Sequence, residues 1–361
     1  MKLFCAVLAS AMMLSVAGYA QTAQPVLPTA SITARKELSI VGGSRLRPMM
    51  DALSPRLAAR YKLPPPDIRL DDSGPAITAL CAGIGPDHPD IAVVPRRMLK
   101  SEFDRCQQAG VFDIIELEIG HGAFVAVVKP DAPFDDISSR ALYLALAAEV
   151  PEDHEEFRAN NFKRWREVHP RLPDLDIKLF GPMRGVGSRS IFEALVMENG
   201  CRGLKAVDYI FSAEQRFKQC STVRGDGAFV ENPEPTAVTA VEQMLKAPAG
   251  AIALTSYAVY LQNMGRLKAL SVSGVRPEMK SFRDDSYEWT SSFYAYFKRG
   301  HMRDKLGRGV VKGIREFMEE VLSEEAGGEK GYLAQSGMIP LDRADRLAEL
   351  AKARRLERFS R

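Results

Sequence analysis

The chain has few of the residues that support metal-dependent or redox chemistry. Its 361 residues include five cysteines and five histidines. The histidines are scattered without HxxxH spacing and no CxxC pair occurs, so neither a zinc site nor a redox motif is indicated. A GK[ST] phosphate loop and a GxSxG elbow are also missing, which argues against nucleotide hydrolysis and a serine esterase. These absences make an enzyme the weaker interpretation, and we expect neither a metal nor a cofactor.

No excess of either charge marks the chain. Lysine and arginine together number 49, and aspartate and glutamate number 46, which leaves a net charge of +3. That balance is too even for a protein that coats nucleic acid with a whole basic face, so we expect no nucleic-acid partner. Positive charge that serves a function must therefore come from a local cluster of arginines.

Apolar runs of membrane-spanning length are missing, and the amino terminus carries a shorter one. Residues 3–16 are apolar, follow Met1 and Lys2, and precede the small residues of segment 17–20. This pattern is typical of a signal peptide over residues 1–20, cleaved after Ala20. An amino-terminal anchor or a buried helix is the alternative. Because Cys5 lies too early to be a lipoprotein cysteine, we expect a soluble exported product that starts with a polar linker over residues 21–36.

Export changes the interpretation of the four cysteines that remain. An even number of cysteines in an oxidising compartment indicates disulfides, and four cysteines allow three connectivities. Pairing of neighbours closes the shortest loops, and each bridge is then worth about 3 kcal/mol in the chain-entropy model. We therefore expect Cys81–Cys106 and Cys201–Cys220. Free buried thiols are the alternative.

Short apolar strands alternate with helical segments through most of the chain. The expected strands cover residues 38–41, 68–70, 91–94, 124–128, 177–180 and 251–254. Helical spacing of apolar residues is clearest at residues 137–146, 190–198 and 310–322. This alternation predicts an α/β fold with mainly parallel strands. We expect residues 342–361 to form a basic helical tail.

Three segments place a serine between the end of a strand and the start of a helix. They contain Ser44, Ser73 and the segment Arg184–Ser190, in which Ser190 and Glu193 fit a capping box. Ordinary helix capping explains any one of these segments. Three of them at the same end of parallel strands favour an anion site, because helix starts carry unpaired N–H groups. The arginines that could add positive charge there are Arg45, Arg96, Arg184 and Arg189.

These segments, in this order, resemble the PstS family of periplasmic phosphate-binding proteins over residues 37–341. Ser44-Arg45 and Ser73-Gly74 are similar to the family's first two loops, and Arg184–Ser190 is similar to its Arg-x-x-Gly-Ser-Gly-Thr loop. Further similar segments are Cys81–Gly83, Asp90–Ala92, Cys106–Val111, Trp165, His169-Pro170, Pro173-Asp174, Arg224–Ala228 and Gly250–Ala253.

The resemblance implies a two-lobed periplasmic binding protein type II fold, with the ligand in the cleft between the lobes. Lobe 1 would comprise residues 37–127 and 270–341, and lobe 2 residues 128–269. The implied function is that of a monomeric solute-binding protein that captures inorganic phosphate or a related oxyanion for an ABC permease of the inner membrane. The residues that the resemblance assigns to the anion are Ser44, Arg45, Ser73, Arg96, Arg184, Ser188, Arg189 and Ser190.

Three positions depart from the family's pattern. Pro95 stands where many members hold an aspartate, Arg45 replaces a threonine or phenylalanine, and Arg189 replaces a glycine. These changes predict a more basic site and allow a larger phosphorylated or phosphonate ligand. A cleft that has lost its ligand, in an envelope scaffold protein, is the main alternative, and a phosphate-ester hydrolase is a distant one. For Arg184, a salt bridge with Asp226 or Asp72 is the structural alternative to a role in binding.

Overall fold

The computed structural model describes residues 34–152, 156–185, 187–234 and 237–360. The predicted signal peptide and residues 21–33 of the predicted linker lie outside these ranges. No helix in the described ranges combines the length and apolar character needed to cross a bilayer.

One nine-stranded sheet organises the described chain. Its order is β2-β1-β3-β13-β4-β10-β8-β9, with β11 also paired to β4. The strands are β1 (Ser39–Gly43), β2 (Asp67–Asp71), β3 (Ile91–Val94), β4 (Ile114–Val128), β8 (Lys178–Gly181), β9 (Phe229–Glu231), β10 (Ala251–Ser256), β11 (Lys268–Ala269) and β13 (Thr290–Lys298). Pairing is parallel among β1, β2 and β3 and among β8, β9 and β10, whereas β4 and β13 run antiparallel to their neighbours. The predicted α/β class is confirmed; pairing is parallel in the two flanks of the sheet, and every pairing that involves β4 or β13 is antiparallel.

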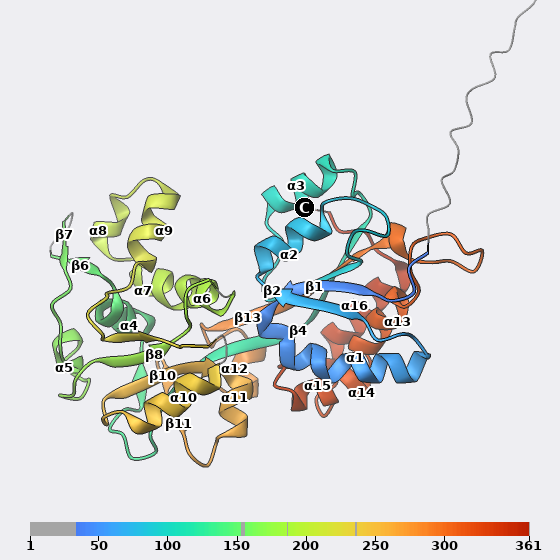
Figure 1. The fold of residues 1–361 in the computed structure, drawn as a ribbon. Helices are drawn as coiled ribbons and strands as arrows, with labels where there is room; N and C mark the ends of the chain where they lie inside the picture. The colour runs from blue at the N-terminus through green and yellow to red at the C-terminus, as the bar shows by residue number, and fades with distance from the viewer. Residues whose placement is uncertain (1–33, 153–155, 186, 235–236, 361) are drawn as a thin grey trace, which may run out of the picture. The chain divides into compact units, whose positions relative to one another are not determined.

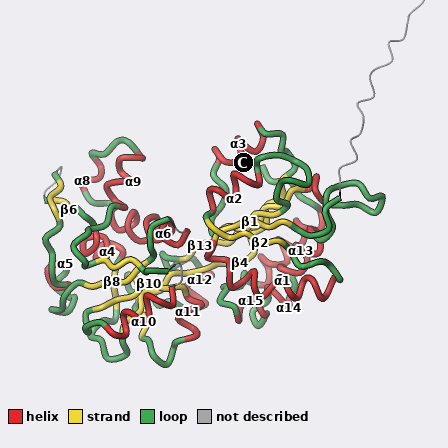
Figure 2. Tube along the Cα trace, in the orientation of Figure 1, coloured by secondary structure: helices red, strands yellow, loops and turns green. Residues whose placement is uncertain are grey.

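The long strand β4 belongs to both halves of this sheet. Its residues from Ile114 to Ala123 pair with β13, and its residues from Phe124 to Val127 pair with β10. We call β2, β1, β3, β13 and the first part of β4 the first sheet half, and the rest the second sheet half. Figure 2 shows β4 and β13 running between the two groups of strands.

Each sheet half is buried on both faces because alternate side chains enter different cores. In β3, Ile91 and Val93 pack into one core, and Ala92 and Val94 into another. In β10 the same alternation sends Ile252 and Leu254 to one side and Ala251 and Ala253 to the other. Side chains point to opposite faces with a period of two, so continuous apolar runs of this kind require cover on both faces.

Helices supply that cover for the first sheet half. They are η1 (Ser44–Leu46), α1 (Arg47–Tyr61), α2 (Ser73–Leu80), α3 (Lys100–Gln108), η3 (Arg299–His301), α13 (Ile314–Val321), α14 (Glu324–Gly327), α15 (Tyr332–Gln335) and α16 (Arg343–Arg355). The predicted carboxy-terminal helix is present as α16, but it is part of the core. Leu350 and Ala353 are buried in the core that also holds β1, and Arg346 is buried and donates to the carbonyl oxygen of Leu322.

The second sheet half is covered in the same way. Figure 1 shows α10 and α11 on one side of β8 and β10, with α4 and α6 on the other. The elements here are β5 (Asp136–Ile137), α4 (Ser139–Leu146), β6 (Glu149–Pro151), β7 (Phe157–Ala159), α5 (Trp165–Val168), α6 (Gly187–Phe192), η2 (Glu193–Glu198), α7 (Asn199–Cys201), α8 (Lys205–Asp208), α9 (Ala213–Ser221), α10 (Ala237–Lys246), α11 (Tyr257–Gln262), β12 (Ser271–Val272) and α12 (Met279–Arg283). Buried residues from Leu270 to Trp289 pack with this half, and the chain rejoins the first half at β13. The predicted lobe boundaries stay predictions.

The disulfides pair as predicted. Cys81 is bonded to Cys106 and joins the end of α2 to α3, and Cys201 is bonded to Cys220 and joins α7 to α9. All four cysteines are buried.

Candidate functional site

The three predicted loops lie together at the ends of their strands. Ser44 follows β1 directly, Asp72 follows β2, and Gly187 opens α6 after β8. A Cβ atom built on Gly187 would lie 3.5 Å from Asp72 Oδ1 and 3.9 Å from Ser44 Oγ. The loop after β8, in the second sheet half, therefore contacts the loops of the first half. This is the end of parallel strands at which open α/β sheets bind ligands.

Arg45 is a half-buried cation at this convergence. Its Nη1 donates to Ser291 Oγ at 3.2 Å, and its guanidinium lies 4.6 Å from the centre of the Phe124 ring and 5.9 Å from that of Phe293. Within the described ranges no carboxylate pairs with it. Desolvation therefore lowers the pKa of Arg45 to about 10. The ring faces offset part of this cost, because aromatic faces attract cations.

Ser73 begins α2 in the second loop. Asp72 caps this helix, since its carboxylate accepts from the Ser73 backbone N–H at 2.6 Å. Ser73 is buried, and its Oγ lies 3.3 Å from a Cβ built on Gly43. Gly74, the next residue, has nothing within 4 Å of its Cβ position. The start of α2 is therefore open to a ligand on that side.

Arg96 is held by an acid from its own segment. Its two terminal nitrogens donate to Glu102 at 2.9 and 2.7 Å in a bidentate pair. The hydrogen bond to Glu102 is the largest cause that raises the pKa of Arg96. The guanidinium that was predicted to add positive charge to the site is therefore neutralised by Glu102.

The two arginines of the third loop are also paired with carboxylates. Arg184 is exposed, and its Nε lies 3.0 Å from Glu231 Oε1. Arg189 is buried with 6% of its side chain exposed, and it contacts Glu193 at 2.6 Å and Glu231 at 3.2 Å. Arg184 therefore forms the salt bridge that was considered as an alternative to anion binding, but its partner is Glu231 and not Asp226 or Asp72. Acids therefore pair with Arg96, Arg184 and Arg189 in this structure, and the assignment of these three arginines to the anion stays a prediction.

The serines of the third loop lie inside the helix. α6 starts at Gly187, three residues before the predicted helix start, so Ser190 is an exposed residue of α6 and does not cap it. Glu193, its expected capping partner, binds Arg189. Ser188 is half-buried in the first turn beside Gly187. Ser44, Ser73 and Ser188 are therefore the hydroxyls that stand at strand ends or helix starts.

A small cavity of about 40 Å³ adjoins Arg45. Pro48 and Met49 of α1, Gly122 of β4 and Tyr257 of α11 are among the residues that line it. Sequence reasoning missed Phe124, Ser291 and Phe293, the residues that hold Arg45. They lie far from Arg45 along the chain, and no local pattern marks them.

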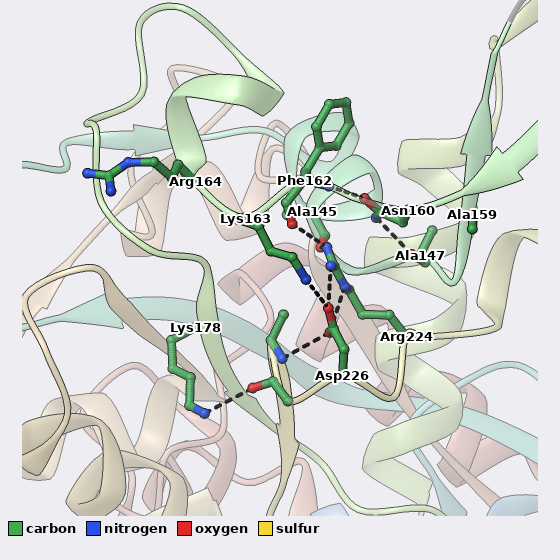
Figure 3. Close-up of polar contacts among 12 residues, drawn as sticks. Ala145, Ala147, Ala159, Asn160, Phe162, Lys163, Arg164, Lys178, Arg224 and Asp226 are labelled. Atoms are coloured by element: carbon green, nitrogen blue, oxygen red, sulfur yellow. Dashed lines mark hydrogen bonds and ion pairs between the residues drawn. The ribbon is translucent and has the colours of Figure 1, made fainter.

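A second polar cluster, away from the loops, stabilises the second sheet half (Figure 3). Arg224 is buried and binds Asp226 in a bidentate pair, while its Nη1 donates to the carbonyl oxygens of Ala145 and Phe162. Lys163 adds a contact of 3.0 Å to Asp226. These hydrogen bonds, above all the one from Arg224, hold the pKa of Asp226 well below its usual range. The cluster ties the end of α4 to the segment after β7.

No set of three metal-ligating side chains is grouped anywhere in the described ranges. Beside the carboxylate of Asp72, the three loops present hydroxyls, backbone N–H groups and the guanidinium of Arg45. Such groups bind an anion by hydrogen bonds and charge.

Comparison with known proteins assigns the class. The family model described as a PBP superfamily domain matches residues 27–325, so the chain belongs to the PBP superfamily. It is 23% identical over 276 residues to the Protein SphX of Synechococcus elongatus, covering 74% of this chain and 70% of that protein. It is 25% identical over 207 residues to the Phosphate-binding protein PstS of Staphylococcus saprophyticus, covering 56% of this chain and 53% of that protein. The resemblance to the PstS family is thus confirmed, at the low identity of a divergent member.

A solved structure supports the same fold. The possible phosphate binding protein from Planctomyces limnophilus superposes with a TM-score of 0.61 at 17% identity, covering 89% of this chain and 99% of that chain. At that identity the likeness establishes the fold alone. The predicted periplasmic binding protein type II fold is confirmed.

Proposed function

We propose that this chain is an exported solute-binding protein that captures inorganic phosphate or a related oxyanion and delivers it to an ABC permease of the inner membrane. The observation that carries the proposal is Arg45, a half-buried guanidinium without a carboxylate partner in the described ranges, at the point where three strand ends meet. Leaving such a charge uncompensated is costly, and a bound anion would compensate it.

The relatives support the choice of anion. Two of the matched proteins carry phosphate binding in their names, the PstS of Staphylococcus saprophyticus and the Planctomyces limnophilus protein. In our proposal Ser44, Ser73 and Ser188 donate hydroxyl hydrogens to the oxyanion, and Arg45 supplies the charge. Arg96, Arg184, Arg189 and Ser190 keep their predicted roles only if ligand binding frees or reorients them.

Asp72 gives the proposed site a preference for a protonated anion. Its carboxylate lies beside Gly187, where it would repel a fully deprotonated anion and accept a hydrogen bond from a protonated one. Hydrogen phosphate carries such a proton at neutral pH, and sulfate does not. This residue would then supply the acceptor that Pro95 cannot.

Thermal unfolding with single anions tests the proposal. The protein, stripped of bound anion, is melted with phosphate, sulfate, phosphonates and sugar phosphates in turn. A specific anion at about 100 times its dissociation constant stabilises the folded state by about 2.7 kcal/mol and raises the melting temperature. We expect phosphate to raise it more than sulfate at equal ionic strength. No shift with any anion would refute anion capture and favour the envelope scaffold.

A further inference from the structure

A concave basic surface lies on the first sheet half, at the segment that leads into α13. Its volume is about 1130 Å³, and Leu356, the residue that follows α16, forms part of its wall. We call it the basic groove. Five cations line it: Arg299, Arg303, Lys305, Lys312 and Arg315.

These five cations carry no carboxylate partner in the ranges that the structure describes. Two acids, Asp304 and Glu316, line the same groove. Asp304 is engaged by its own loop, because its carboxylate accepts from the backbone N–H groups of Leu306 and Arg308 at 2.9 Å and from Arg308 Nε at 2.7 Å. Five cations against these two acids leave the groove with three excess positive charges, although the whole chain is nearly neutral.

The loop beside the groove is fixed and exposes an apolar tip. Met302 and Val311 form a bridge at its base, and Asp304 closes the turn from within. At the tip Leu306 is 79% exposed, next to Lys305. The ribbon in Figure 1 shows this loop projecting beside α13. Membrane-surface binding combines burial of apolar side chains with attraction between basic residues and anionic lipids, and this surface offers both kinds of side chain.

We propose that the basic groove and Leu306 dock this protein on an anionic phospholipid bilayer. In this docking Leu306 enters the headgroup layer, and the five cations meet lipid phosphates. Anionic lipids attract each nearby cation, and the leucine adds apolar burial. A soluble polyanion would use the cations but would have no use for Leu306, so the exposed leucine favours the membrane. The proposal is independent of which solute the chain binds.

Sedimentation with vesicles tests the docking. The full chain is mixed in low salt with vesicles of phosphatidylcholine alone, or with vesicles that also contain about 30% of the anionic lipid phosphatidylglycerol. We expect binding to the anionic vesicles only, weakened by added salt because salt screens charges. The double variant Lys305→Gln, Lys312→Gln should bind about thirtyfold less, since each cation contributes about fivefold. Leu306→Ser should bind about tenfold less.

A matched variant and a soluble polyanion complete the experiment. The double variant Lys205→Gln, Arg171→Gln removes two exposed cations of the second sheet half, and it should sediment like the unchanged chain. All proteins carry the same amino terminus, so its contribution cancels. Equal sedimentation with both vesicle types, or no loss in the Lys305, Lys312 variant, would overturn the proposal. It would also be overturned if Leu306→Ser sedimented normally while inorganic polyphosphate displaced the chain, because the groove would then take a soluble polyanion.

Discussion

Replacement of Arg45 by methionine should change stability and anion binding in opposite directions. The guanidinium is half-buried and has no carboxylate partner among the described residues, and the lowering of its pKa to about 10 corresponds to about 3 kcal/mol of desolvation cost. The two ring contacts and the hydrogen bond to Ser291 offset roughly 2 kcal/mol of this desolvation cost. Methionine keeps an apolar stem against Phe124 and Phe293. The ligand-free variant should therefore be as stable as the unchanged protein, or more stable by about 1 kcal/mol.

Anion affinity should fall in the same variant. A hydrogen bond to a charged group is worth about 1.5–3 kcal/mol, so the dissociation constant for phosphate should rise at least tenfold. Calorimetric titration gives the affinity, and urea unfolding with and without phosphate gives the stability. Arg56→Met is the matched control, because Arg56 of α1 also places its guanidinium over an aromatic ring, 4.3 Å from the centre of Tyr332. It should leave phosphate affinity unchanged.

Two results would refute this reasoning. If Arg45→Met destabilised the ligand-free protein by more than about 1 kcal/mol and bound phosphate normally, Arg45 would be a packing residue. If the unchanged protein bound no anion at all, the proposed function would fail before the variant was considered.

Three further predictions concern stability. Replacement of Cys201 and Cys220 by serine should lower the free energy of unfolding by about 3 kcal/mol, since the bridge closes a separation of 19 residues; urea melts check this, and an unchanged midpoint would contradict it. Arg224→Met should cost about 3 kcal/mol because it leaves Asp226 with less compensation and two carbonyl oxygens unpaired, and the Asp226 contribution, present above the usual carboxyl pKa, should be lost as pH falls below it. His301 donates to Asp90, accepts from the Gly85 N–H at 3.0 Å, and has a pKa lowered mainly by burial, so stability should decrease as pH falls below about 6.5; a pH series in which His301→Asn kept that decrease would assign it elsewhere.

Strand positions were predictable because apolar runs reflect burial on both faces. β3 covers Ile91–Val94 as expected, and β10 begins at the expected Ala251. The disulfide pairs also followed from loop length. The strands depend on residues that are close in the sequence. The disulfides depend on export to an oxidising compartment, which the amino terminus indicates.

The electrostatics of the site could not be predicted in this way. Arg189 contacts Glu231 across 42 positions of sequence, and Arg45 contacts Ser291 across 246. Periodicity and turn chemistry carry no information about such tertiary pairs, so the acids that pair with these arginines could not be identified from the sequence. The start of α6 was misplaced for a related reason, because Glu193 satisfied a capping pattern and then paired with Arg189 in the fold.

The place of β13 in the sheet has a consequence for how the chain matures. In the part of the chain that the structure describes, β3 pairs with β1 on one side and with β13 on the other, and β13 joins β3 to β4. A nascent chain that emerges amino terminus first therefore holds β3 as an open edge until Thr290–Lys298 has been made. Open edges invite pairing with other chains, and contacts between distant segments form slowly. A chain truncated before Thr290 would leave both β3 and the first part of β4 without their shared neighbour, and we expect such a product to aggregate.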